Sequence, residues 1–115
     1  MEENKSEVLP GTLNLMILKT LDTLGQLHGY GIARRIEQTS GNLLSLNQGT
    51  IYPALIHLEQ MGWISSKWGL SENNRKAKYY SITNTGKKQL VAEEGNWRRA
   101  SAIMVRFLEA MEGNA

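Results

Sequence analysis

The sequence predicts a mostly α-helical domain of the α+β class, with a small β-hairpin and a long C-terminal helix. Apolar residues recur at helical spacing in four segments of the 115-residue chain. Two runs alternate between apolar and polar residues around one polar turn, which is typical of paired strands. Hydrophobic residues make up 41% and charged residues 21% of the chain, as in a globular protein.

The first helix is expected to begin at Thr12, which is suited to cap it, and to end at Gly25. Its main apolar stripe follows the i, i+3, i+4 pattern of an amphipathic helix. Leu15 and Leu18 lie outside that stripe. They predict a second apolar surface, through which this helix contacts more than its own domain.

A second helix is predicted between Gly29 and Gly41, where glycines favour helix boundaries. Its inward side chains are expected to be Tyr30, Ala33 and Ile36. The apolar segment 43–46, LLSL, is too short for a helix and predicts a brief strand.

A third helix is predicted within residues 47–64, NQGTIYPALIHLEQMGWI, although a proline lies inside it. Pro53 falls on the face of the helical wheel opposite the apolar stripe. That stripe consists of Ile51, Leu55 and Leu58. Because proline has no amide to donate, the helix either begins near residue 50, or begins near residue 48 with an opened first turn.

The hairpin is predicted from two alternating runs, WISSKWG at 63–69 and AKYYSIT at 77–83, around the polar turn SENNRK. Trp63 and Trp68 adjoin this hairpin and are interpreted as packing residues. A long helix follows from residue 83 or 84 towards Met111.

Positive charge is concentrated in the hairpin segment. Residues 67–88 contain six basic side chains and one acidic side chain, a net charge of +5, whereas the whole chain carries +2. The remainder is therefore acidic, at −3. Such an asymmetry indicates a polyanionic partner, and a solvated turn of lysines is the competing interpretation.

The predicted order of elements is helix, helix, short strand, helix, hairpin, long helix. It is the order of a winged helix-turn-helix domain, whose third helix enters the DNA major groove while the hairpin, or wing, lies along the backbone or minor groove. Basic residues at a wing favour phosphate binding over a solvated turn. A winged-helix protein-interaction module without DNA binding is the alternative function.

Three motifs resemble the PadR family of bacterial transcriptional regulators, in the branch with a single C-terminal helix. They are HGYGIARRI, LNQGTIYPALIHLEQMGWISSKWG and NNRKAKYYSITNTGKKQL. The resemblance covers about nine-tenths of the chain. It implies a homodimeric winged-helix DNA binder, commonly a repressor, whose last helix forms much of the dimer interface. At Ala77 many members carry a basic residue, so one phosphate contact is expected to be weaker here.

The expected organisation has three parts. Residues 1–8 form a flexible tail, residues 9–83 the winged helix-turn-helix domain, and residues 84–115 the dimerisation helix. The start of the chain lacks the apolar core of a signal peptide, and no apolar run approaches the roughly twenty residues of a membrane span. A cytoplasmic location without membrane contact is therefore expected.

The predicted DNA-binding residues come from the third helix and the wing. Short polar side chains near a helix start suit base edges or phosphates, and a tyrosine hydroxyl suits a phosphate oxygen. The set is Gln48, Thr50, Tyr52, His57, Arg75, Lys76 and Lys78. The third helix contains no arginine, so base selection is expected to depend on Gln48, thymine methyl groups and DNA shape. A dimer would place two such helices about one DNA turn apart on a palindromic operator.

The last helix predicts a homodimer independently of the resemblance, because apolar residues recur in it every seven positions. An amphipathic helix folded back on its own core is the alternative. The predicted interface comprises Leu15, Leu18, Leu90, Trp97, Met104, Phe107, Leu108 and Met111.

Trp97 has two interpretations. As a structural residue it fills the dimer seam, where aromatic residues are common. The resemblance also implies a ligand contact, because certain PadR-like regulators bind planar effectors between their subunits. Met104 would suit an adaptable pocket wall, so these two residues are the candidate site for a small aromatic effector.

Catalysis is not expected, and no cofactor or metal is predicted. The chain contains no cysteine, and His28 and His57 lack the spacing of metal ligands. The sequence has no glycine-rich phosphate loop, and its serines and carboxylates form no recognisable catalytic arrangement.

Overall fold

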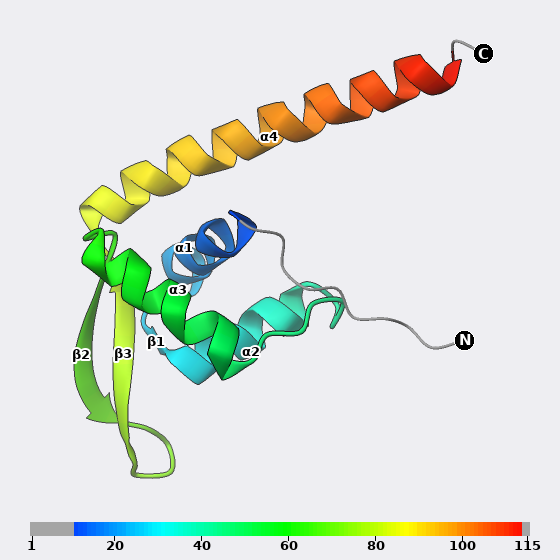
Figure 1. The fold of residues 1–115 in the computed structure, drawn as a ribbon. Helices are drawn as coiled ribbons and strands as arrows, with labels where there is room; N and C mark the ends of the chain where they lie inside the picture. The colour runs from blue at the N-terminus through cyan, green and yellow to red at the C-terminus, as the bar shows by residue number, and fades with distance from the viewer. Residues whose placement is uncertain (1–10, 114–115) are drawn as a thin grey trace, which may run out of the picture.

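A computed structural model describes residues 11–113 of the chain. The predicted tail at residues 1–8 lies outside this range. The described elements are α1 (Thr12–Leu24), β1 (Leu27–His28), α2 (Gly29–Thr39), α3 (Gln48–Gln60), β2 (Ile64–Leu70), β3 (Lys76–Ile82) and α4 (Asn84–Gly113). Figure 1 shows the three shorter helices packed together, the hairpin beside α3, and α4 extending across the opposite side. The predicted winged helix-turn-helix fold with a long C-terminal helix is confirmed.

The sheet is antiparallel, with the strand order β1-β3-β2. The wing strands pair along their full length, from Ile64 opposite Ile82 to Leu70 opposite Lys76. Leu27 pairs with Tyr80 and extends the sheet by two residues at its base. The predicted hairpin is therefore confirmed, and a short third strand joins it to the start of α2.

The strand predicted at residues 43–46 is wrong. This segment is a loop in which a single residue, Leu44, makes a strand-like bridge. The amide of Leu46 donates instead to a side chain, Oε2 of Glu37, at 2.9 Å. Leu46 is buried in the core and Leu44 packs against it, so these two leucines reflect burial and not strand pairing, whereas Leu43 is 53% exposed.

The core is built from one face of each short helix and from the base of the sheet. It comprises Ile17, Leu18, Leu21, Ile32, Ala33, Ile36, Leu46, Ile51, Leu55, Leu58, Ile64, Tyr80 and Leu90. Burial of these side chains supplies most of the driving force for folding, at roughly 25 cal/mol per Å² of apolar surface.

Two residues predicted at a dimer interface belong to this core. Leu18 is 0% exposed and Leu90 is 4% exposed within one protomer. Leu15 is partly buried and packs against the same cluster. The second apolar surface of α1 is thus largely covered by the chain's own α4, because the first part of α4 lies against it. Neither Leu18 nor Leu90 leaves appreciable side-chain surface for a partner.

The boundaries of α1 differ slightly from expectation. Gly11, with φ of 87°, occupies the cap position, and Thr12 is the first helical residue. Gly25 ends the helix as predicted, because its amide donates to the carbonyl of Leu21 at 3.0 Å and its φ of 83° stops further helical turns.

The start of α4 is fixed against the turn between α3 and β2. The Thr83 hydroxyl donates to the carbonyl of Gly62 at 2.7 Å and accepts from the amide of Gly86 at 2.9 Å. The Thr83 amide donates to the carbonyl of Trp63 at 3.0 Å. A side chain at Gly86 would place its Cβ only 2.0 Å from that same carbonyl oxygen. Only glycine permits this approach.

Beyond this junction α4 continues as one helix through Gly95 to Gly113. Its thirty residues span about 45 Å at 1.5 Å per residue. The C-terminal half projects past the rest of the domain (Figure 1). That half therefore has no protomer surface to cover its apolar residues.

Gly86→Ala is expected to lower the free energy of unfolding by about 3 kcal/mol, because a methyl group would collide with the Trp63 carbonyl. Gly95→Ala is the matched control in the same helix. Its Cβ would meet only the Arg99 guanidinium at 3.5 Å, so it should stabilise by about 0.5 to 1 kcal/mol. Chemical denaturation measures both values. Equal effects at the two positions would contradict the close contact at Gly86.

Candidate nucleic-acid interface

Helix α3 has one buried and one exposed face, as the helical wheel predicts. Ile51, Leu55 and Leu58 are buried in the core. The exposed residues are Gln48, Gly49, Thr50, Tyr52, Pro53, Ile56, His57 and Gln60. The four residues of α3 predicted to bind DNA are all in this exposed set. Their exposure leaves them available to a partner.

The first turn of α3 is capped by Asn47. Its side-chain Oδ1 accepts from the Thr50 amide at 3.0 Å and from the Thr50 hydroxyl at 3.2 Å. Its carbonyl also accepts from the amide of Ile51 at 3.0 Å. An ordered helix start of this kind carries a partial positive charge, which favours phosphate oxygens.

Pro53 lies within α3 and does not mark its beginning. The helix starts at Gln48, so the alternative start near residue 50 is wrong, and the first turn is closed by the Ile51 amide instead of being opened. Pro53 cannot donate to the carbonyl of Gly49. Both residues are exposed, so water can bind that carbonyl at little cost.

The tip of the wing carries two exposed cations, Arg75 and Lys76. Lys76 Nζ lies 5.9 Å from the centroid of the Trp68 ring, a cation–π arrangement. Trp68 is 63% exposed, so its predicted role in packing is wrong. The wing carries Trp68 beyond the core, whose buried hairpin members are Ile64 and Tyr80. Trp63, nearer the base, does pack against the core as predicted.

Lys78 differs from Arg75 and Lys76 because it has a carboxylate partner. Its Nζ lies 3.5 Å from Oε1 of Glu59, at the C-terminal end of α3. The other carboxylate oxygen of Glu59 accepts from the Ser66 hydroxyl at 2.5 Å. Glu59 therefore joins α3 to both strands of the wing.

The same carboxylate affects Tyr80. Burial raises the pKa of the Tyr80 phenol above its usual value, and its electrostatic interactions with the Glu59 carboxylate and then with Tyr52 raise it further. Tyr80 is accordingly neutral through the physiological pH range. Its side chain packs the base of the wing against the core.

Helix α2 contributes two residues that are absent from the predicted DNA-binding set. Tyr30 and Arg34 line a hollow of ≈ 250 Å³ against α3 and also a hollow of ≈ 650 Å³ against the turn of the wing. Arg34 is exposed and pairs with Glu37 at 3.5 Å. These two side chains therefore occupy the surface between the two predicted DNA-binding elements.

The prediction that Tyr30 points inward is wrong, because its side chain is 64% exposed. The start of α2 packs closely against α3 at Gly29. A Cβ added at this position would lie 3.2 Å from the nearest atom of the Tyr52 ring. Ile32, Ala33 and Ile36 form the buried face instead. The adjacent arginines at 34 and 35 were the one sequence signal that α2 faces a polyanion.

A second candidate surface lies on the projecting half of α4. The predicted interface residues there are between 49% and 59% exposed in the protomer. They are Trp97, Met104, Phe107, Leu108 and Met111. A row of large apolar side chains with this exposure is typical of a protein–protein interface. The apolar side chains at the heptad positions in the C-terminal half of α4 are thus exposed and available to a partner.

An exposed ion pair adds to the apolar contact between the first half of α4 and α1. Glu94 forms ion pairs with Lys19 at 3.2 Å and with Arg98 at 3.0 Å. Hydrogen bonds from Arg98 and Lys19 lower the pKa of the Glu94 carboxyl below its usual value. This exposed network orients the helix without contributing a catalytic or metal-binding arrangement.

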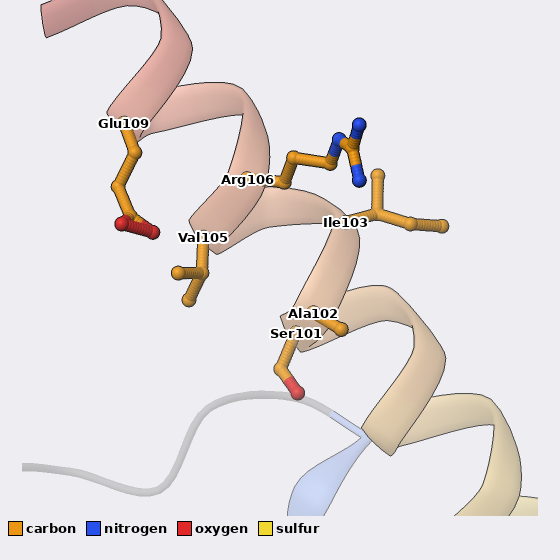
Figure 2. A pocket seen from close by; sticks show the side chains of 6 residues that line it. All are labelled: Ser101, Ala102, Ile103, Val105, Arg106 and Glu109. Carbon is orange, nitrogen blue, oxygen red and sulfur yellow. The ribbon is translucent and has the colours of Figure 1, made fainter. Parts of the chain in front are cut away.

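The candidate effector residues Trp97 and Met104 are about half exposed on α4. A hollow of ≈ 690 Å³ on α4 is lined by Ser101, Ala102, Ile103, Val105, Arg106 and Glu109. Figure 2 shows that all six side chains project from the one helix. The hollow is therefore an open groove along α4, and neither Trp97 nor Met104 belongs to it.

Two other kinds of site find no support in the described part of the chain. Between residues 11 and 113, no group of three or more histidine, cysteine, aspartate or glutamate side chains is placed to hold a metal ion. Within the same range, no helix is long and apolar enough to cross a membrane.

Comparison with known proteins identifies a family. The model of the family described as "Transcriptional regulator PadR-like family" matches residues 17–92. The matched segment runs from α1 through the wing into the first turns of α4. It therefore includes all seven residues predicted to bind DNA.

Solved structures agree with this match. A transcriptional regulator from Clostridium thermocellum is 29% identical, with a TM-score of 0.76 over 84% of this chain and 93% of that one. A PadR family transcription regulator from Clostridium difficile is 31% identical, with a TM-score of 0.72 over 84% of this chain and 97% of that one.

One relative is named for its role in regulation. The negative transcriptional regulator PadR of Bacillus subtilis is 30% identical over 66 residues, which are 57% of this chain and 36% of the relative. This chain therefore matches about a third of that longer protein. The matched family is one of transcriptional regulators, which are not an enzyme class.

Asn47→Ala should lower the free energy of unfolding by about 1 kcal/mol, because the Thr50 amide loses its side-chain acceptor. Asn47→Ser is the matched control, since serine caps helices about as well and should retain most of the stability. Thermal or chemical unfolding of the two variants provides the measurement. An alanine variant as stable as the serine variant would show that the cap does not hold α3.

Proposed function

The chain belongs to the PadR-like family of transcriptional regulators, and we propose that it is a sequence-specific DNA-binding repressor that acts as a homodimer on a palindromic operator. One observation carries the proposal. The N-terminal end of α3 and the turn of the basic wing lie on the same side of the domain, opposite α4 (Figure 1). A single DNA duplex can therefore contact both while α4 remains free to pair.

In the proposed complex, α3 enters the major groove with its capped end. Gln48 and Thr50 lie at that end and reach base edges or phosphates, while Tyr52 donates its hydroxyl to a phosphate oxygen. His57 lies further along the exposed face and contacts the groove wall. With no arginine in α3, sequence preference depends on Gln48, thymine methyl contacts and DNA deformability.

The wing supplies phosphate contacts. Arg75 and Lys76 are exposed at its tip, whereas Arg34 of α2, between the wing and α3, is paired with Glu37. Phosphate contacts fix the position of a protein on DNA but carry no base information. The wing therefore contributes affinity and orientation, and α3 contributes the choice of sequence.

The projecting half of α4 is proposed to pair with a second copy of the chain. Its exposed apolar side chains occupy one broad face, and one protomer does not cover them. Two-fold pairing of α4 would present two α3 helices about 34 Å apart, one turn of DNA. This spacing predicts two inverted half-sites.

The proposed regulator represses transcription and is released by an effector. Repression is supported by the relative in Bacillus subtilis, which is named a negative regulator. Trp97 and Met104 are exposed on the proposed pairing face, so two copies would place four such side chains around the seam. A flat aromatic compound that stacks there is the proposed effector, and the proposed location of the regulator is the cytoplasm.

The function is tested by selection from a random DNA pool at near-physiological salt, where a palindrome should be enriched. On the enriched sequence, Arg75→Ala with Lys76→Ala should weaken binding of all sequences alike and reduce the slope of log K against log salt by about 1.8. Arg99→Ala with Arg106→Ala removes the same charge from α4 and is the control, expected to leave the slope unchanged.

Failure to enrich any palindrome would contradict the proposed function. Enrichment combined with unchanged binding by the wing variant would contradict only the role of the wing. Binding of a protein partner without DNA would favour the alternative of a protein-interaction module.

The pairing of α4 predicts two chains per particle at micromolar concentration. Phe107→Asp should give a monomer, because a carboxylate would be buried in the seam, while the folded protomer tolerates it at an exposed position. Glu109→Gln on the polar side of α4 is the control. Analytical ultracentrifugation measures the mass, and circular dichroism confirms that the variants are folded. A monomeric wild-type protein would overturn the proposed interface.

A further inference from the structure

We propose that Glu59 is a positioning residue that docks the wing onto α3 and withholds Lys78 from DNA. The wing then binds phosphate through Arg75 and Lys76, without Lys78. This inference rests on the proposed DNA-binding function. It distinguishes the wing cations that bind phosphate from the one that is paired within the protein. The positions of the basic residues in the sequence do not reveal this difference.

The geometry of Glu59 supports docking. Its two carboxylate oxygens have different partners on different strands. Oε2 accepts from the Ser66 hydroxyl of β2 at 2.5 Å, and Oε1 lies 3.5 Å from the Lys78 ammonium of β3. One side chain of α3 therefore contacts both strands of the wing.

The strand register places these partners on one face of the hairpin. Ser66 lies opposite Tyr80, and Lys78 lies opposite Trp68, two residues further towards the tip. Since side chains alternate along a strand, Ser66, Lys78 and the buried Tyr80 share the face turned towards α3. Glu59 therefore makes its contacts where the buried base of the wing gives way to the exposed tip.

Lys78 is the wing cation that is already neutralised. Among the residues that the structure describes, neither Arg75 nor Lys76 forms an ion pair with a carboxylate. The Lys78–Glu59 pair is part-exposed, at 40% and 35% of the side-chain surface, so a phosphate could compete for Lys78 in principle. Accessibility alone does not decide the outcome.

Charge balance favours the internal pair. If Lys78 moved to a phosphate, the Glu59 carboxylate would remain beside the DNA backbone without a cation. The Ser66 hydroxyl holds that carboxylate in place, so it cannot easily turn away. Like charges at close range across an interface are costly. The pair therefore persists in the complex, and Glu59 removes one phosphate contact from the wing.

The functional consequence is a lower, less salt-dependent affinity for DNA of any sequence. Each phosphate contact contributes about 0.9 to the slope of log K against log salt and strengthens binding to every sequence. A wing with one contact fewer binds random DNA less tightly. The readout of bases by α3 is unaffected, since phosphate contacts carry no sequence information.

The test uses four full-length proteins, namely wild type, Lys78→Met, Glu59→Gln and the double variant. Glutamine keeps an oxygen that can accept from Ser66 but loses the charge that holds Lys78. Affinity for operator and for random duplex is measured between about 50 and 200 mM salt. Glu72→Gln removes one negative charge from the turn of the same wing and serves as the matched control.

The expected slopes follow from the released lysine. Lys78→Met alone should leave the wild-type slope unchanged. Glu59→Gln should steepen it by about 0.9 and strengthen random-sequence binding, and Lys78→Met should reverse both effects in that background. Any effect of Glu72→Gln should not depend on Lys78.

Two results would overturn the withholding of Lys78. One is a fall of about 0.9 in the slope when Lys78→Met is made in the wild type, since Lys78 would then already contact phosphate. The other is a gain in Glu59→Gln that survives Lys78→Met, since net charge alone would then explain it.

Docking is tested without DNA by hydrogen exchange of the β2 and β3 amides. Glu59→Ala, which loses both partners, should exchange faster there than Glu59→Gln and Glu72→Gln. Unchanged exchange in Glu59→Ala would overturn docking. If the wild type bound no DNA, the proposed function would fail, while hydrogen exchange would still decide whether Glu59 holds the wing.

Discussion

Gly86 lies so close to the turn between α3 and β2 that a side chain there would overlap the Trp63 carbonyl. Thr83 completes the junction, because its hydroxyl bonds to the Gly62 carbonyl and caps the first turn of α4. The end of α3, the base of the wing and the start of α4 therefore meet at one point. The direction in which α4 leaves the domain is fixed relative to α3, and the remaining architecture depends on that angle.

A fixed angle matters because the proposed pairing and DNA-binding surfaces lie at opposite ends of this junction. The exposed apolar half of α4 determines where a second copy would sit, and the capped end of α3 determines where a base pair would be read. A rigid connection converts pairing of α4 into a set distance between two α3 helices. It would also give the proposed effector at the proposed seam a mechanical route to DNA, because a change in the crossing angle of the two α4 helices would alter that distance.

The candidate nucleic-acid interface contains structural carboxylates as well as basic residues. Glu59 and Glu37 lie among the cations and both stabilise the structure, since Glu59 binds both wing strands and Glu37 holds the Leu46 amide ahead of α3. The carboxylates thereby fix the elements that carry the cations. Pro53 is similarly harmless, because its exposed position leaves the Gly49 carbonyl open to water while the packing face of α3 stays intact.

Helical and strand periodicity are local properties of the chain, so they were enough to predict the fold class, the buried face of α3, the hairpin and the glycine stops. They missed β1, since a two-residue strand has no periodicity and is defined by its pairing with Tyr79 and Tyr80. A helical wheel also shows which residues are apolar without showing what covers them. The burial of Leu18 and Leu90 within the protomer, the exposure of Trp68 and Tyr30, and the pairing of Lys78 emerged from the three-dimensional packing alone, because each depends on a neighbour distant in sequence.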